Sequence, residues 1–142
     1  MKIIKKTKEL EDLLGSADSL NKPIGLVLTM GNIHAGHISL VKKAKKNNDF
    51  VITSIFVNPS QFDNKDDYNS YPRTLNEDIK KLKSSNCDLL FLPSVDEIYP
   101  NGLDKVRSVS KYRNILCDIN RPGHFDGVTT VVNTFFDIVK PK

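Results

Sequence analysis

Three short, almost wholly apolar runs constrain the fold of this 142-residue chain more than any other feature. They are IGLVL at 24–28, FVITSIFV at 50–57 and DLLFL at 88–92. Runs of this length without polar alternation are typical of strands that are covered on both faces, as in a parallel sheet. Between and after these runs, apolar residues recur with helical spacing. The segments with this spacing are 7–20, 35–47, the stretch that follows Thr74, and 128–139.

The alternation of strand and helix predicts an α/β fold, a Rossmann-like parallel sheet flanked by helices, in a single domain that covers 1–142. Residues 93–123 contain several prolines and glycines. Within them we expect only a short strand near Val106–Val109 and a short helix near Lys111–Leu116. An alternating fold normally follows a helix with another strand, whereas this chain stops soon after its last predicted helix. We therefore expect a fragment of a longer protein.

Composition indicates a soluble globular domain. Of the residues, 39% are hydrophobic and 27% are charged, and no run approaches the ~18 apolar residues that cross a membrane. Two cysteines, Cys87 and Cys117, are too few for a disulfide framework, so we expect reduced thiols and a cytoplasmic protein. The net charge is +4, with lysines clustered at 42–46 and 80–83 on the outer faces of predicted helices. No aromatic residues are interleaved with these lysines, which argues against nucleic-acid binding.

The segment LTMGNIHAGH at 28–37 begins where the first apolar run ends. In a parallel sheet, ligands collect beyond the carboxyl ends of the strands, so a ligand is expected at this segment. Gly31 permits a tight turn, and Gly36 lets a ligand approach the first helical turn. Free N–H groups at a helix start attract phosphate, and two imidazoles three residues apart, His34 and His37, would add hydrogen bonds to its oxygens.

Two other interpretations of these histidines remain open. The H-x-x-H spacing supplies two metal ligands, and His124 could supply the third nitrogen of a zinc site. The histidines could also simply pack at the start of a helix. A nucleophilic hydrolase is disfavoured, because no serine or cysteine occupies a G-x-S-x-G elbow. The RPGHF stretch at 121–125 either binds an anion or joins a loop to the last helix.

Polar residues near the ends of other elements also allow structural and functional interpretations. Asn58 and Gln61 follow the second apolar run, where they either form a turn or orient a polar substrate. Thr74 and Glu77 match a helix capping box. We favour this cap over a Mg²⁺ site at Glu77 and Asp78.

Together these stretches resemble the pantoate–β-alanine ligase family, whose members are also called pantothenate synthetases. TMGNIHAGH looks like that family's form of the HIGH motif of nucleotidyltransferases. SIFVNPSQF, YPRT, EIYPNG and RPGHFDGVTTVV resemble further blocks of the family in the same order, so the match runs along essentially the whole chain. The resemblance implies the N-terminal, Rossmann-like domain that binds ATP and pantoate.

The activity implied by the resemblance is a ligation in two steps that forms a carbon–nitrogen bond and uses ATP and Mg²⁺. The carboxylate of pantoate attacks the α-phosphorus of ATP, which forms pantoyl adenylate and releases pyrophosphate. The amine of β-alanine then attacks the activated acyl carbon, which gives pantothenate and AMP. A carboxylate is already ionised at neutral pH, so the first step needs positioning and charge neutralisation rather than a nucleophilic side chain.

Site roles follow from the resemblance position by position. His37 and His34 would be the catalytic residues, with His37 the acid or charge stabiliser at the phosphates. Gln61 would bind pantoate and help to place β-alanine, with Asn58 and Tyr71 supporting that pocket. The residues implied for ATP binding are Thr29, Met30, Gly31, His34, Gly36 and His37. No residue is assigned as a metal ligand.

The chain departs from the family pattern in several places. Leu28 stands where the family usually has proline, and Leu116-Cys117-Asp118 stands where it tends to have Leu-Glu-Gly. The family's later G-E-K-D and S-S-R blocks, which supply a lysine and an arginine to the ATP phosphates, do not occur in this sequence, and neither does its C-terminal lid domain.

We therefore expect the chain alone to be nearly inactive, and the family's homodimer is an expectation for the full-length protein. Two alternative functions are a non-catalytic module that binds a nucleotide or pantoate, and a nucleotidyltransferase with another acceptor.

Overall fold

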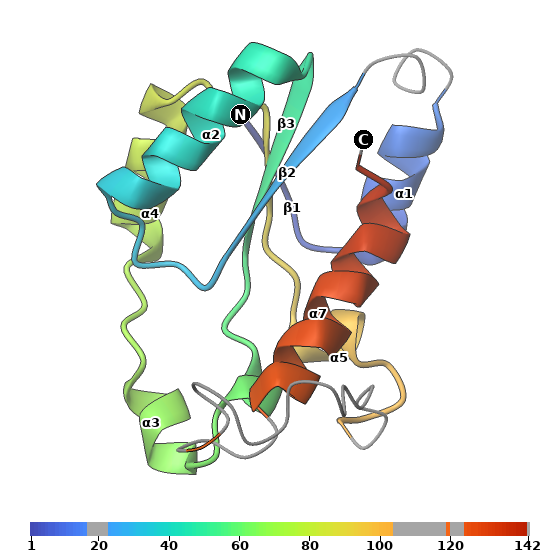
Figure 1. The fold of residues 1–142 in the computed structure, drawn as a ribbon. Helices are drawn as coiled ribbons and strands as arrows, with labels where there is room; N and C mark the ends of the chain where they lie inside the picture. Colours follow the sequence, from blue (N-terminus) through green and yellow to red (C-terminus); the bar gives the residue numbers. More distant parts are fainter. Residues whose placement is uncertain (17–22, 104–118, 120–123, 142) are drawn as a thin grey trace.

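A four-stranded parallel sheet lies between two layers of helices (Figure 1). The computed structural model describes residues 1–16, 23–103, 119 and 124–141. Its strands are β1 (Lys2–Ile4), β2 (Ile24–Thr29), β3 (Phe50–Ile55) and β4 (Leu89–Phe91). They pair in the order β1-β4-β3-β2, and each pair is parallel. The predicted Rossmann-like α/β fold is therefore confirmed.

The helices separate onto the two faces of the sheet. One face is covered by α2 (Ala35–Asn47) and α4 (Leu75–Ser84) (Figure 1). The other face is covered by α1 (Thr7–Gly15), α7 (His124–Val139) and the short α5 (Val95–Ile98). The 3₁₀ helix η1 (Pro59–Gln61) and the short helix α3 (Lys65–Ser70) follow β3 and lie beyond the carboxyl end of the sheet. They flank the end of the sheet where a ligand is expected.

Alternating strand residues supply two apolar cores, one on each face of the sheet. The core beside α2 and α4 includes the buried residues Val41, Val51, Leu82 and Leu90. The core beside α1 and α7 includes Leu10, Ile52, Leu89, Phe91 and Phe135. Burying each such side chain contributes about 1.5–3 kcal/mol. Because β3 and β4 are buried on both faces, they lack the polar alternation of a half-exposed sheet.

The predicted helix over 35–47 is confirmed at both ends, whereas the helix predicted over 7–20 ends at Gly15. Residues 17–20 lie outside the described part of the chain. The sequence did not predict β1, η1, α3 or α5, because elements of three to six residues are too short to show a period. The strand predicted near Val106–Val109 and the helix predicted near Lys111–Leu116 also lie outside the described residues.

The clustered lysines mostly cover exposed helix faces, as the sequence predicts. Lys45 is an exception, because it is half-buried and its Nζ lies 2.8 Å from the Asp88 carboxylate. Among the described helices, none is both long and apolar enough to cross a membrane. Cys87 is a buried free thiol whose pKa is raised by that burial, and Cys117 lies outside the described residues.

Candidate functional site

The loop after β2 turns sharply and is tied to β3. Gly31 has φ +84° and Asn32 has φ +49°, so two successive residues adopt the left-handed conformation. The Thr29 hydroxyl donates to the Ser54 carbonyl oxygen at 2.8 Å and accepts from the Gly31 N–H at 3.1 Å. A Cβ on Gly31 would lie 3.3 Å from an Asp78 carboxylate oxygen, so glycine satisfies both the turn and the close approach.

The carboxylate of Asp78, on α4, holds this loop in place. Its side chain is buried, and Asp78 as a whole is 1% exposed. Oδ1 accepts from the Ile33 N–H at 2.7 Å and from the Thr74 hydroxyl at 3.1 Å, while Oδ2 accepts from the Asn32 N–H at 3.0 Å. These hydrogen bonds to a charged acceptor offset the cost of removing the carboxylate from water.

The capping box predicted from Thr74 and Glu77 is wrong. Thr74 makes no side-chain cap, because its hydroxyl donates to Asp78 instead. Glu77 lies on the exposed face of α4 and pairs with Lys80 at 3.1 Å. In this segment it is therefore Asp78 that stabilises the loop, by accepting hydrogen bonds from backbone N–H groups.

His34 and His37 cap the start of α2 reciprocally. The Nδ1 atom of His34 accepts from the Gly36 N–H at 3.1 Å, and Nδ1 of His37 accepts from the His34 N–H at 3.4 Å. The ring centroids lie 4.0 Å apart. Since both Nδ1 atoms accept, the hydrogen of each neutral ring is on Nε2, which leaves two N–H donors at the helix start.

This cap changes the role expected of Gly36. A Cβ on Gly36 would lie 2.9 Å from Cε1 of His34, so the glycine makes room for the imidazole rather than for a ligand. The Gly36 N–H, expected to be free for phosphate, donates to His34. An anion at this helix start would therefore meet the two Nε2–H groups in place of that backbone donor.

The local environment keeps His37 neutral. Burial first, and then repulsion by a charged His34, lower the pKa of His37 below its ordinary value of 6.5, while Asp78 acts in the opposite direction. The unfolded chain consequently holds this proton more tightly than the folded chain. This difference in the pKa of His37 stabilises the folded chain at pH values above the ordinary histidine pKa. The stabilisation is lost as the pH falls through the lower pKa that His37 has in the folded chain.

Most of the predicted site residues meet in one cavity of about 310 Å³, here called the Gln61 cavity. The predicted residues that line it are Thr29, Met30, Gly31, His37, Asn58, Gln61 and Tyr71. Its apolar wall comes chiefly from α7, through Val128, Val131, Val132 and Phe135. His34 and Gly36 do not line this cavity; both are exposed on the first turn of α2.

Asn58 supports this cavity through bonds within the protein. Its Nδ2 donates to Gln61 Oε1 at 3.0 Å and to the Gly127 carbonyl oxygen at 3.3 Å. Its Oδ1 accepts from the Tyr99 hydroxyl at 2.7 Å and from the Ser60 hydroxyl at 2.9 Å. Because Gln61 Oε1 faces Asn58, the Nε2 amide group of Gln61 is left to donate to a ligand.

Ser54, a polar residue that the sequence did not predict as part of the site, also lines the Gln61 cavity. Ser54 is 1% exposed, and within the described part of the chain its Oγ has no hydrogen-bond partner. A buried hydroxyl without a partner costs about 1–3 kcal/mol, so it marks a position where a bound polar group would be stabilised. No sequence signal distinguishes this serine from its neighbours in the strand.

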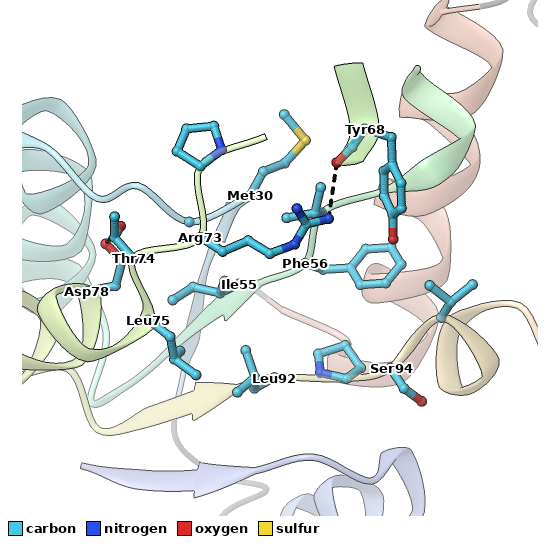
Figure 2. Close-up of a pocket in the computed structure, with 15 residues that line it drawn as sticks. Met30, Ile55, Phe56, Tyr68, Arg73, Thr74, Leu75, Asp78, Leu92 and Ser94 are labelled. Atoms are coloured by element: carbon cyan, nitrogen blue, oxygen red, sulfur yellow. Dashed lines mark hydrogen bonds between the residues drawn. The ribbon is translucent and has the colours of Figure 1, made fainter. Parts of the chain in front are cut away.

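Two further cavities adjoin the same loop. The His124 cavity, of about 350 Å³, is lined by Met30, Gln61, Phe62, Asp67, Ser70, Tyr71, Pro72 and His124. The Arg73 cavity, of about 270 Å³, lies between the ends of β3 and β4 and the segment 68–78. Figure 2 shows the Arg73 side chain reaching toward Tyr68, whose carbonyl oxygen accepts from the guanidinium at 3.1 Å. The Arg73 guanidinium is thus already hydrogen-bonded to the protein backbone.

Among the residues that the structure describes, no three His, Cys, Asp or Glu side chains group together as potential metal ligands. His124 is instead hydrogen-bonded through Nδ1 to the Gln61 carbonyl oxygen at 3.2 Å.

Asp78→Asn tests the role of the buried carboxylate. The amide of asparagine would point N–H groups at backbone N–H donors, and its oxygen would be a neutral acceptor in place of a charged one. We therefore expect the free energy of unfolding to fall by about 2–3 kcal/mol. Glu77→Gln, one residue away on the exposed face, is the matched control and should change it by less than about 0.5 kcal/mol. Urea denaturation measures both variants. Equal stability of the two would contradict the assigned role.

The chain is similar to known pantothenate synthetases. A family model described as pantoate-beta-alanine ligase matches residues 2–142. The pantothenate synthetase of Saccharophagus degradans is 48% identical over 143 residues, and that of Thermosipho africanus is 48% identical over 141 residues. Each match covers 99% of this chain but only 50% and 51% of the two relatives, so the chain spans about half their length.

A solved structure agrees with these matches. The pantoate-beta-alanine ligase from Francisella tularensis, complexed with beta-gamma ATP and beta-alanine, is 47% identical and superposes with a TM-score of 0.91. That match covers 99% of this chain and 54% of the other. The chain therefore belongs to the pantoate–β-alanine ligase family.

Proposed function

We propose that this chain provides the pantoate site and part of the ATP site of a pantoate–β-alanine ligase. One observation carries the proposal: the Gln61 cavity combines, within apolar walls, the His37 ring with the Gln61 amide donor and the Ser54 hydroxyl, neither of which has a partner among the described residues. The reaction is the AMP-forming condensation of pantoate with β-alanine through pantoyl adenylate.

Pantoate matches the chemistry of this cavity. It is a small acid with a branched apolar centre, two hydroxyl groups and one carboxylate. The α7 wall, with Val131 and Val132, suits the branched centre, while Gln61 Nε2 and Ser54 Oγ suit the polar groups. Tyr71 lies at the same cavity and supports the pantoate site, whereas Asn58 acts by orienting Gln61.

ATP is proposed to bind along the loop after β2 and the start of α2. Thr29, Met30 and Gly31 form the loop beside the cavity, and the Nε2–H groups of His34 and His37 would donate to phosphate oxygens. These donors would stabilise the charge that grows on the phosphates as the carboxylate attacks. Gly36 contributes indirectly, by allowing the His34 ring to lie over the helix start.

Mg²⁺ is proposed to enter with ATP rather than through a protein cage. The described residues offer no group of three potential ligands, and Asp78 already accepts three protein hydrogen bonds. Mg²⁺ bound to nucleotides commonly keeps several water ligands and uses phosphate oxygens. The cytoplasmic location and the homodimer of the full-length protein stay predictions.

The isolated chain should bind substrates but ligate them slowly. Without the lysine and arginine expected from the rest of the family's fold, phosphate charge would be only partly neutralised and water would not be excluded. We expect calorimetric binding of ATP and pantoate, with AMP release at least roughly 10²-fold slower than in a full-length relative.

Exchange of labelled pyrophosphate into ATP distinguishes the alternatives. Exchange that depends on pantoate supports the ligase, and preference for a different acid would reveal another acceptor. Binding without any exchange would make the chain a non-catalytic module. Ligation of β-alanine at the rate of the full-length relative would overturn the predicted dependence on the half of the relatives that this chain does not span.

Ser54→Ala tests the position of pantoate. Removing a hydroxyl that has no partner in the described part of the chain should leave the melting temperature unchanged or raise it. Pantoate affinity should fall by roughly tenfold if the hydroxyl binds the ligand. Ser84→Ala, on the exposed face of α4, is the control for loss of a hydroxyl. Unchanged pantoate affinity in Ser54→Ala would place pantoate elsewhere.

A further inference from the structure

His124 is held in the opposite tautomer from the other two histidines. Its Nδ1 lies 3.2 Å from the Gln61 carbonyl oxygen, which can only accept a hydrogen bond. Nδ1 therefore carries the hydrogen of the neutral ring, and Nε2 keeps its lone pair. Within the described part of the chain, no protein group is hydrogen-bonded to that Nε2. His34 and His37 present N–H donors at Nε2, whereas His124 presents an acceptor.

His124 lies at a cavity that adjoins the proposed pantoate site. His124 lines the His124 cavity, which shares Met30, Gln61 and Tyr71 with the Gln61 cavity. A group bound in one cavity would thus lie beside a group bound in the other. The Asp67 carboxylate also lines the His124 cavity and gives it negative charge. A lone pair and a carboxylate suit an ammonium group and disfavour a phosphate.

We propose that His124 binds the amino group of the second substrate and accepts its proton, which makes His124 a further catalytic residue. The inference rests on the proposed ligase function, because it needs an amine that attacks an activated acyl group. A primary ammonium has no lone pair at neutral pH and cannot attack carbon. A neutral imidazole within hydrogen-bond reach is the usual protein group for removing such a proton.

One proton passes from the ammonium nitrogen to Nε2 of His124, and the freed lone pair forms a bond to the acyl carbon of pantoyl adenylate. The tetrahedral adduct passes a second proton from nitrogen to solvent water. It then collapses with cleavage of the bond between the acyl carbon and the phosphate oxygen, and AMP leaves with that electron pair.

The tautomers can be measured directly, because the chain contains only three histidines. Long-range proton–nitrogen correlation NMR, at a pH where the rings are neutral, should show His124 protonated on Nδ1 and His34 and His37 protonated on Nε2. This measurement needs no variant. A ring of His124 that is protonated on Nε2 would overturn the proposal.

β-Alanine should then shift the Nε2 resonance of His124, whereas propionate, which has the same carboxylate but no amine, should not. In His124→Asn the side-chain amide can still donate to the Gln61 carbonyl oxygen, but nothing occupies the Nε2 position. We expect roughly tenfold weaker β-alanine binding in this variant. Equal shifts with propionate, or equal affinity in the variant, would show that His124 does not hold the amine.

Supplied pantoyl adenylate tests proton transfer without the ATP step. The chain should accelerate its aminolysis by β-alanine, and His124→Asn should lose roughly 10²-fold of that rate. Hydroxylamine, which is already neutral at neutral pH, should react equally with both proteins. If His124→Asn lost both the β-alanine and the hydroxylamine reaction, His124 would have a structural role instead. If it lost neither, the proposal that His124 acts as a general base would be overturned. Calorimetry with pantoate tests the proposed function separately. The proposed pantoate site and the proposed role of His124 can therefore fail independently.

Discussion

The hydrogen bonds between the buried Asp78 carboxylate and the N–H groups of Asn32 and Ile33 determine the geometry of the site. They join α4 to the loop after β2, a loop whose left-handed residues would otherwise be costly to hold. That loop places Met30 at the three cavities and leads directly into the helix start that carries His37. Burying a carboxylate is unfavourable in itself, and the converging backbone N–H donors offset that cost at Asp78.

A second buried network, centred on Asn58, performs the same task for the other side of the site. Asn58 joins η1 to α7 through the Gly127 carbonyl oxygen and to the end of α5 through Tyr99. Burial raises the pKa of the Tyr99 hydroxyl, which keeps it a donor to Asn58. A Cβ on Gly127 would lie 2.8 Å from the Ser60 carbonyl carbon, so this contact depends on glycine. The result is a Gln61 side chain whose acceptor is occupied and whose donor is available.

Much of the fold could be predicted from the sequence, because burial on both faces of the strands and helical spacing are local patterns. The placement of His37 and Gln61 beside one cavity was also predictable, since both follow strands of a parallel sheet. The role of Asp78 was not, because its partners are backbone groups far away in the chain. For the same reason the sequence predicted a capping box at Thr74, whose hydroxyl proved to have a tertiary partner.

The hydrogen-bonding state of each histidine could not be read from sequence either. His34, His37 and His124 are the same residue type, yet backbone partners make two of them donors and one an acceptor. This division is consistent with the proposed function, in which a phosphate binds near one group and an amine near another. Each functional role thus follows from a backbone partner and not from the side chain alone.

We propose that an ATP phosphate binds at the imidazole of His37. NMR titration of His37 with and without ATP tests this claim most directly. We predict a pKa below the ordinary 6.5 in the free chain and a clear rise when ATP is added, because a phosphate favours the protonated ring. An unchanged pKa of His37 under conditions where calorimetry shows bound ATP would contradict the account.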